Sequence, residues 1–575
     1  MLERKFHYKD GGEKKLRDIV LSDSFDEDKS WMQYRDTWNI FYHLTPERGN
    51  LFNWGLFQGE SNLNILEVGS GCGAITAALA QEKAINSITC IEGEESRSEI
   101  AKIRLKDHGD KIKHINQNMF DYKPEALFDV VIAVGVLEYS GKYNQGTKPY
   151  SDFLNCVKSF LKPGGKLILA IENQLGHKYL AGADEDHYQR PYIGISDYQF
   201  YDGIRTFSKS HLIEKIDNSG LKHHKFYYPF PDYKLPKIIL SDKAFQDPKF
   251  DWLTLFDFPT DQHTKRPNYK FNEKAFLELL KDNVDPGVFM NSFLIVASDE
   301  EIEDANENLL AAKVNTTRYL PYRSVKRFEH NQKGEIEVVE SNFVNEEKVT
   351  SSYYNQSENL GSLLVDAILR EDVSRLQEYL VVWRNLLEEK IVVDYGGEQS
   401  SIQDLWKDYT HQTISNFYNS SKKFVESKAL DLIPNNILKV NNQYVLIDLE
   451  WEIPCKKIPL DLVIDRGLYW MINKVLRVSG KSGNPVEDGK WNVSPKLQSV
   501  LKVHDHKSLE LFESWFQSYA CTGENEAKKD LQNLLYSQAL WHVKLKKYFK
   551  QILKRQLNHL KKSRIIVRFA KLITE

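Results

Sequence analysis

The chain has 575 residues, 41% of them hydrophobic and 27% charged; at about 150 residues per domain this allows three to four domains and excludes wholesale disorder. Lysine and arginine number 77 against 81 aspartates and glutamates, and the net charge of −4 excludes a globally basic nucleic-acid binder. Five cysteines without a CxxC pair indicate neither a disulfide framework nor a zinc site. No uninterrupted apolar run of about 18 residues predicts a transmembrane helix, so we expect a cytoplasmic protein.

Four regions follow one another along the chain. Residues 1–37 are mostly polar and predict an irregular lead-in. Over 38–298, short apolar runs alternate with helical stretches, as in a parallel sheet with crossover helices. After a charged segment, residues 308–520 predict a second, α+β domain with strand-like pieces followed by helices. Residues 525–575 predict a basic helical tail.

A glycine-rich turn is the strongest motif in the first domain. Residues 64–76 read NILEVGSGCGAIT, an apolar strand that runs into the turn and then into a helix. Gly69, Gly71 and Gly73 allow the backbone to turn tightly and a ligand to approach it closely. The N-terminus of the following helix offers unpaired N–H groups, so the motif predicts a ligand site.

Four more strands each end in side chains or glycines that suit a nucleotide-like ligand. They are expected at residues 87–91, 112–116, 128–134 and 166–171. Glu92, at the end of the first of these, provides the carboxylate that ribose hydroxyls need. Asn118 and Met119 follow the next strand, where a polar group can meet an adenine edge and an apolar group can cover its face. Gly135 follows the fourth strand of the domain, and a Lys-Pro-Gly-Gly turn precedes the fifth.

With these parts in this order, residues 38–298 resemble the class I S-adenosylmethionine-dependent methyltransferases. The resemblance implies a Rossmann-like α/β fold with a mostly parallel seven-stranded sheet and S-adenosylmethionine as cofactor. A Rossmann dehydrogenase also has glycines followed by an acidic strand end, but it usually carries G-x-G-x-x-G, which this turn lacks. The cofactor-binding residues implied by the resemblance are Glu67, Gly69, Ser70, Gly71, Gly73, Glu92, Asn118, Met119 and Gly135.

A second resemblance concerns the acceptor. Segments 42–48, 172–179, 181–187 and 226–236 look like bacterial methyltransferases encoded with surface-polysaccharide and O-antigen assembly proteins. This resemblance implies O-methylation of a saccharide or glycan-linked acceptor. An acceptor hydroxyl needs a base within hydrogen-bond reach, and His187 is the first candidate. Asp186 could orient or replace it, and Glu172 lies where the fifth strand opens toward the cofactor; no spacing of metal ligands is visible, so no metal is predicted.

Two segments of the second domain resemble kinase-like phosphotransferases. In that family's terms Asp431 would meet the acceptor hydroxyl, while Asn436 and Asp448 would hold Mg²⁺ beside ATP phosphates. Gly334 is the only glycine between residues 308 and 345, so no glycine-rich loop covers the phosphates and the domain is expected to be degenerate. Two alternatives therefore stay open: a bifunctional methyltransferase–kinase that terminates glycan chains, and a non-catalytic scaffold of a glycan-assembly complex.

The tail combines a helical apolar stripe with basic residues. From residue 541 to 575 it carries 11 lysines and arginines and one acidic residue, Glu575. A basic amphipathic helix of this kind can lie on the anionic inner face of the membrane, each basic group contributing about 1 kcal/mol. A helix packed on its own domain is the alternative, and a nucleic-acid partner is not expected.

Overall fold

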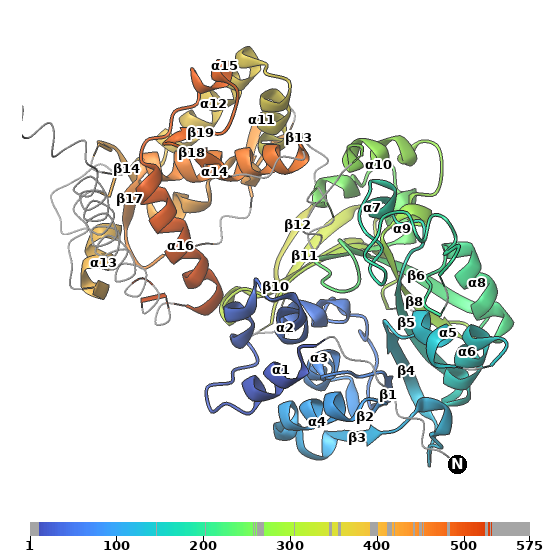
Figure 1. The fold of residues 1–575 in the computed structure, drawn as a ribbon. Helices are drawn as coiled ribbons and strands as arrows, with labels where there is room; N and C mark the ends of the chain where they lie inside the picture. The colour runs from blue at the N-terminus through green and yellow to red at the C-terminus, as the bar shows by residue number, and fades with distance from the viewer. Residues whose placement is uncertain are drawn as a thin grey trace, which may run out of the picture.

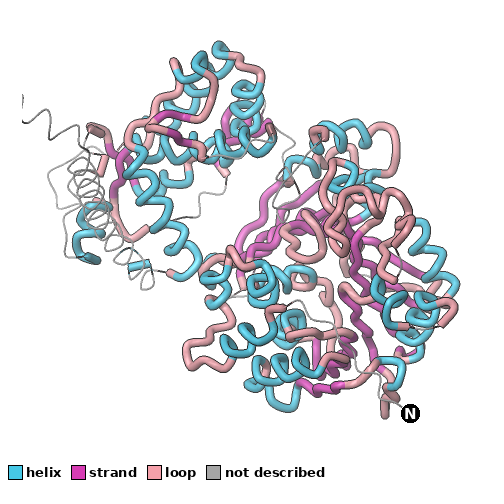
Figure 2. The backbone as a smooth tube through the Cα atoms, in the orientation of Figure 1, coloured by secondary structure: helices cyan, strands magenta, loops and turns pink. Residues whose placement is uncertain are grey.

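A computed structural model describes most of the chain. The described residues are 11–531, except 145, 202, 257, 259, 261–269, 304, 344–347, 355–357, 392–400, 411–416, 419, 441–442, 448–450, 452, 480–483, 524–526 and 529–530. They form an N-terminal part built on one large sheet and a C-terminal part built mainly of helices (Figures 1 and 2).

Twelve strands of the N-terminal part form one sheet, in the order β12-β11-β10-β9-β7-β6-β8-β5-β4-β1-β2-β3. Their bounds are β1 Leu63–Val68, β2 Ile85–Glu92, β3 Ile112–Asn116, β4 Phe128–Val134, β5 Leu161–Glu172, β6 His223–Phe230, β7 Ile238–Ser241, β8 Ser292–Ser298, β9 Leu309–Asn315, β10 Ser324–His330, β11 Ile336–Asn342 and β12 Lys348–Tyr353.

The predicted Rossmann-like sheet is confirmed in seven of these strands. β3, β2, β1, β4 and β5 are parallel neighbours, and β8 runs antiparallel between β5 and β6, so six of the seven point the same way. In the register of β1, Glu67 lies opposite Cys90 of β2 and Ile132 of β4. These central strands are buried apolar runs because helices cover both faces of the sheet.

The sheet continues past the boundary expected at residues 299–307. β9 pairs antiparallel with β7, with Ile239 opposite Ala312, and β10, β11 and β12 add to its other side. The charged segment is a loop between two buried strands, and the run Leu309–Ala312 is buried in the same core. Residues 309–353 therefore extend the first sheet, where the sequence predicts the start of a second domain.

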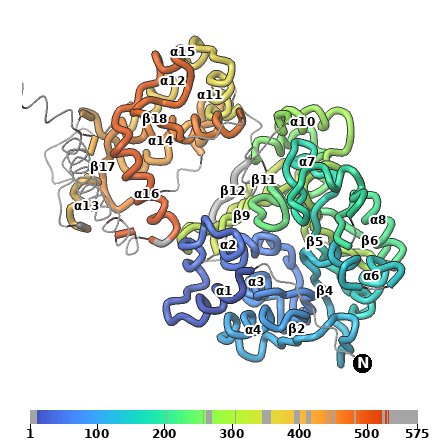
Figure 3. Tube along the Cα trace, viewed as in Figure 1, coloured from blue at the N-terminus to red at the C-terminus, as the bar shows by residue number. Residues whose placement is uncertain are grey.

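Helices on the N-terminal part lie on both sides of the sheet (Figure 3). Their bounds are α1 Glu13–Val20, α2 Trp38–Leu44, α3 Ala74–Gln81, α4 Glu95–Arg104, α5 Ser140–Tyr143, α6 Pro149–Ser159, α7 His177–Leu180, α8 Lys209–Asn218, α9 Asp242–Gln246 and α10 Glu273–Lys281. Within the lead-in that the sequence predicts to be irregular, residues 13–20 form the amphipathic helix α1. Its Leu16 and Val20 pack in a small core with Ile40, Leu44 and Ile100.

The C-terminal part is mainly helical. Its helices are α11 Leu360–Leu369, α12 Val373–Glu388, α13 Ile402–Thr410, α14 Leu460–Val478, α15 Pro495–Gln498 and α16 His506–Thr522. Its short strands are β13 Glu358–Asn359, β14 Phe424–Glu426, β15 Ile437–Val440, β16 Gln443–Leu446, β17 Lys457–Pro459, β18 Val486–Glu487 and β19 Lys490–Trp491. A core rich in tryptophan holds it together. It meets the N-terminal part where Tyr319 N donates to Ala520 O at 2.7 Å and Tyr322 packs on Trp451.

The kinase-like segments lie on β15 and β16 and just ahead of them. Asp431 is buried with its carboxylate 3.5 Å from Arg466 Nη1, and Asn436 Nδ2 donates to the backbone oxygen of Asp431 at 2.9 Å. Asp448 lies outside the described residues, and the kinase resemblance stays a prediction. Residues 532–575, which hold nearly all of the expected tail, also lie outside them. In the described part, no helix is both long enough and apolar enough to cross a bilayer.

Candidate active site

The glycine turn between β1 and α3 has the backbone that its sequence predicts. Gly69, Gly71 and Gly73 have φ angles of +72°, +56° and +79°, and residues other than glycine rarely adopt this backbone conformation. A Cβ added at Gly69 would lie 2.7 Å from Val136 Cγ2, whereas one added at Gly71 would meet nothing closer than Arg97 Nη1 at 4.0 Å. The turn is thus packed on its inner side and open at Gly71.

Two carboxylates hold the turn. Glu92 Oε2 accepts from Gly71 N and Oε1 accepts from Glu94 N, both at 2.8 Å. A carboxylate has about four acceptor sites, so two remain for a ligand hydroxyl. Glu67 is buried and accepts from Thr76 Oγ1 at 2.6 Å. Burial raises the pKa of Glu67 to about 7.

One cavity of about 940 Å³ brings the predicted cofactor residues together. Glu67, Gly69, Ser70, Gly71, Glu92, Asn118, Met119 and Gly135 all line it. Gly73 lies behind the turn, where an added Cβ would come within 2.9 Å of Leu105 Cδ1. Asn118 Oδ1 accepts from Phe120 N at 3.0 Å, and this bond fixes the backbone after β3.

The opposite wall of the cavity holds residues that the sequence analysis did not assign to the cofactor. Tyr42 of α2 and Arg48 line it, and the Arg48 guanidinium lies over the Tyr42 ring with its carbon 4.0 Å from the centroid. Arg48 is 8% exposed, and its Nε has no hydrogen bond within the described residues. The sequence analysis included both residues in segment 42–48 and related that segment to the acceptor.

Three features of the cavity fit S-adenosylmethionine. They are the open backbone at Gly71, the free acceptor sites of Glu92 and the buried guanidinium of Arg48, whose Nε has no hydrogen bond within the described residues. This cofactor has a methionine carboxylate and ribose hydroxyls. Glycines with positive φ leave room for a ligand beside the main chain.

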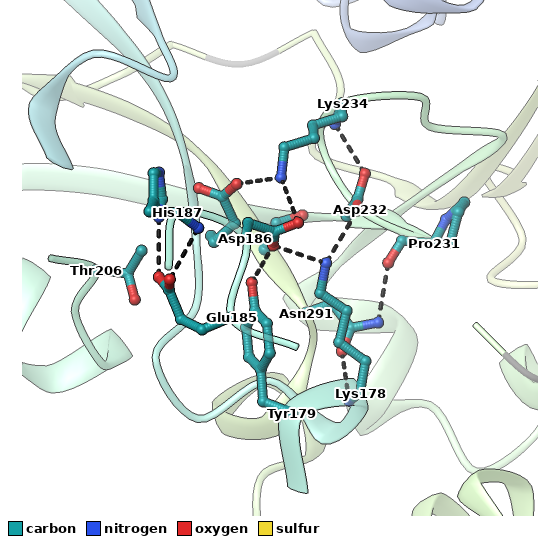
Figure 4. A network of polar contacts seen from close by, with 12 residues as sticks. Lys178, Tyr179, Glu185, Asp186, His187, Thr206, Pro231, Asp232, Lys234 and Asn291 are labelled. Carbon is teal, nitrogen blue, oxygen red and sulfur yellow. Dashed lines mark hydrogen bonds and ion pairs between the residues drawn. The ribbon is translucent and has the colours of Figure 1, made fainter. Parts of the chain in front are cut away.

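The acceptor end of the same cavity holds a network of charged side chains (Figure 4). Asp186 accepts from Lys178 Nζ and lies close to Lys234 Nζ, each at 3.1 Å, and Tyr179 also donates to it. Asp232 accepts from Lys178 at 3.2 Å. Burial opposes ionisation of Asp186, but the charges of Lys178 and Lys234 outweigh it and hold its pKa well below the usual range. Asp186 is therefore a paired anion and a weak base.

His187 is fixed by its neighbour Glu185. The ring Nδ1 lies 2.9 Å from Glu185 Oε1, and the backbone N of His187 donates to Glu185 Oε2 at 2.8 Å. Burial lowers the pKa of His187, but the bond to Glu185 and the charge of Glu172 outweigh it and raise the pKa to about 9. At neutral pH the imidazole therefore holds a proton, and it has to lose that proton before it can act as a base.

Two buried glutamates lie beside His187. Glu172, at the end of β5, is fully buried; its Oε1 pairs with Lys234 and its Oε2 has no hydrogen bond within the described residues. Glu138 is 1% exposed, and neither of its carboxylate oxygens has a hydrogen bond there. Burial, and then the charge of Glu172, raise the pKa of Glu138 to about 8. The sequence analysis missed Glu138, for which an acidic residue just after β4 was the only signal.

Comparison with known proteins agrees with the cofactor half of this site. Residues 66–167 match the family model described as "Methyltransferase domain". The "Ubiquinone biosynthesis O-methyltransferase" of Rickettsia akari (strain Hartford) is 32% identical over 28% of this chain and 60% of its own length. The protein of that name from Rickettsia canadensis (strain McKiel) is 25% identical over 28% of this chain and 64% of its own. The chain thus spans less than two thirds of these relatives.

Two further matches complete the comparison. The "Bifunctional methyltransferase" of Rickettsia typhi (strain ATCC VR-144 / Wilmington) is 25% identical over 32% of this chain and 40% of its own length. Among solved structures, the N-methyltransferase NodS from Bradyrhizobium japonicum WM9 with S-adenosyl-L-homocysteine has 17% identity and a TM-score of 0.23, over 36% of this chain and 86% of that one. Residues 66–167 thus match a methyltransferase domain, and the residues that line the cavity fit S-adenosylmethionine as its cofactor.

Proposed function

We propose that the chain is an S-adenosylmethionine-dependent O-methyltransferase that acts on a sugar hydroxyl of a bacterial surface glycan or its lipid-linked precursor. The observation that carries this proposal is that the glycine turn and the charged network line one cavity. Its volume of about 940 Å³ is near the upper end of ligand pockets, about 300–1,000 Å³, so a cofactor and part of an acceptor fit together.

The first half of the site holds the cofactor. When bound, S-adenosylmethionine supplies a methyl group on a positively charged sulfur. The turn at Gly69 and Gly71 receives its methionine end, Glu92 its ribose hydroxyls, and Asn118 with Met119 its adenine. The chain's own part would be to hold the bound cofactor and the acceptor hydroxyl in the geometry that methyl transfer needs, with the hydroxyl proton leaving to water.

The second half of the site suits an acceptor with several hydroxyl groups. Glu172, Lys178, Glu185, Asp186, His187 and Lys234 line it, so charged acceptors and donors of hydrogen bonds alternate around a small volume. A hydrogen bond to a charged group contributes about 1.5–3 kcal/mol of free energy, so a ligand with both donors and acceptors would bind favourably here. The resemblance of segments 172–179 and 226–236 to polysaccharide methyltransferases supports a saccharide, and the relatives' names support oxygen as the methylated atom.

Labelled methyl transfer tests the proposal. Full-length protein is incubated with S-adenosylmethionine carrying a labelled methyl group and with surface glycan from cells that lack the protein. We expect label in the glycan, located on a sugar by mass spectrometry, and glycan from cells that have the protein serves as a pre-methylated control. Label that reaches neither glycan while the cofactor binds would overturn the acceptor, and failure to bind the cofactor would overturn the activity.

A further inference from the structure

We propose that Glu138, Glu172 and His187 together bind a divalent metal ion at the acceptor end of the cavity. Each contributes one ligand atom, and the three atoms lie within 4.8 Å of one another. They come from three separate segments: the turn after β4, the end of β5 and the loop after α7. The sequence predicts no metal because ligands from such distant segments form no spacing pattern.

The first support is the incomplete hydrogen bonding of the two glutamates. Both oxygens of Glu138 and Oε2 of Glu172 have no hydrogen-bond partner within the described residues, although both side chains are at most 1% exposed. Buried polar atoms are normally bonded, so such atoms gathered in one place indicate a missing ligand. A cation coordinated there would give one oxygen of each glutamate a partner.

The second support is the way His187 is held. Glu185 fixes Nδ1 at 2.9 Å, which leaves Nε2 as the ring nitrogen available to a ligand. Histidines that bind metals commonly donate their other ring N–H to a carboxylate, which sets the tautomer and the ring orientation. Glu185 thus has the place of the outer carboxylate in a carboxylate–histidine–metal arrangement.

Nearby lysines do not replace this cation. Lys178 is engaged by Asp186 and Asp232, and Lys234 by Asp186 and one oxygen of Glu172. In Figure 4 these lysines lie on the side of the network away from Glu185 and His187. Neither oxygen of Glu138 has a hydrogen bond within the described residues.

One imidazole nitrogen and two carboxylates suit a first-row metal such as Mn²⁺ or Fe²⁺, since carboxylates favour Mn²⁺ and imidazole favours iron and zinc. Three protein ligands leave coordination positions open. This inference rests on the proposed function. The metal would bind the acceptor hydroxyl and lower the pKa of that hydroxyl, so that the hydroxyl proton leaves to water as the oxygen accepts the methyl group. His187 would then be a metal ligand, where the sequence predicts a base.

Mn²⁺ binding to chelator-treated, full-length protein tests the site, by calorimetry and electron paramagnetic resonance, with Mg²⁺ and Zn²⁺ as comparison ions. We expect saturable binding of one Mn²⁺ that is lost in Glu138→Gln, Glu172→Gln and His187→Gln. Glu185→Gln should weaken it by about 10- to 100-fold, as changes in outer carboxylates do. Asp232→Asn removes one charge from the same network but no ligand, and should bind Mn²⁺ like the wild type.

Cofactor binding is measured on the same samples and shows whether each variant is folded. Failure of the wild type to bind Mn²⁺, or equal binding by the three ligand variants with cofactor binding intact, would overturn the metal site and leave the proposed function standing. Tighter binding of Zn²⁺ than Mn²⁺ at the same three residues would keep the site and change its metal. Loss of cofactor binding in the wild type would instead refute the proposed function.

Discussion

Replacement of Glu92 by alanine tests the cofactor half of the site most directly. The carboxylate accepts from the backbone N of Gly71 and of Glu94, each at 2.8 Å, and it lines the cavity. A hydrogen bond to a charged group contributes about 1.5–3 kcal/mol. Loss of one such bond to the cofactor ribose raises the Kd by about 10- to 150-fold.

Isothermal titration with S-adenosylmethionine measures this Kd, and thermal unfolding without cofactor separates binding from folding. Glu92→Gln keeps one oxygen acceptor and should lie between alanine and the wild type. Glu95→Ala, at an exposed position three residues further on, is the matched control and should bind like the wild type. A Glu92→Ala protein that melts and binds like the wild type would refute the assignment of Glu92 to the ribose.

Three more outcomes are expected. Gly71→Ala should lose cofactor binding because its Cβ enters the space open to the ligand. Both Gly71→Ala and Gly69→Ala carry the strain of a positive φ, but only the Cβ at position 69 also meets Val136 at 2.7 Å, so Gly69→Ala should lower the melting temperature more; equal melting of the two would contradict this. Burial lowers the pKa of His177 to about 4. Between about pH 6.5 and 4 the unfolded chain therefore binds a proton that the folded chain does not, and the free energy of unfolding decreases as the pH falls through this range. Relative to His177→Gln, the wild type should lose about 3 kcal/mol more unfolding free energy, measured with denaturant at pH 7 and pH 4, and parallel curves would refute it. Full-length protein should sediment with anionic vesicles at low salt, but not at high salt or after truncation following Gln538; if both forms stay in the supernatant, the tail does not bind membranes.

The residues that the sequence assigns to the cofactor lie together in the structure, for a physical reason. Parallel strands end at one edge of a sheet, so polar residues at or near the carboxyl ends of β1, β2 and β3 must converge there. Chain order and strand periodicity point to Glu92 and Asn118, the methyltransferase resemblance adds Glu67, and the structure brings all three to one cavity.

The other half depends on contacts that no local pattern encodes. Glu138 lies in a short turn whose side-chain direction follows no period, and it gains meaning only beside Glu172 and His187. The same holds for Arg48, because only the folded structure shows that it lines the cavity. The charged segment 299–307 predicts a boundary because solvated loops and linkers share a composition, and only the pairing of β9 with β7 tells them apart.

The two halves of the site share a short piece of backbone, and this joins donor to acceptor. Gly135 follows β4 with φ +67° and lines the cavity, and an added Cβ there would lie 2.7 Å from Tyr233 Oη and 3.5 Å from Glu138 Oε1. A side chain at this position would therefore collide with Tyr233 and crowd the buried carboxylate of Glu138. Because β5 pairs beside β4, Glu172 at its end reaches the same place. In the proposed function, this pair of strand ends would set the distance between the methyl donor and the groups that hold the acceptor.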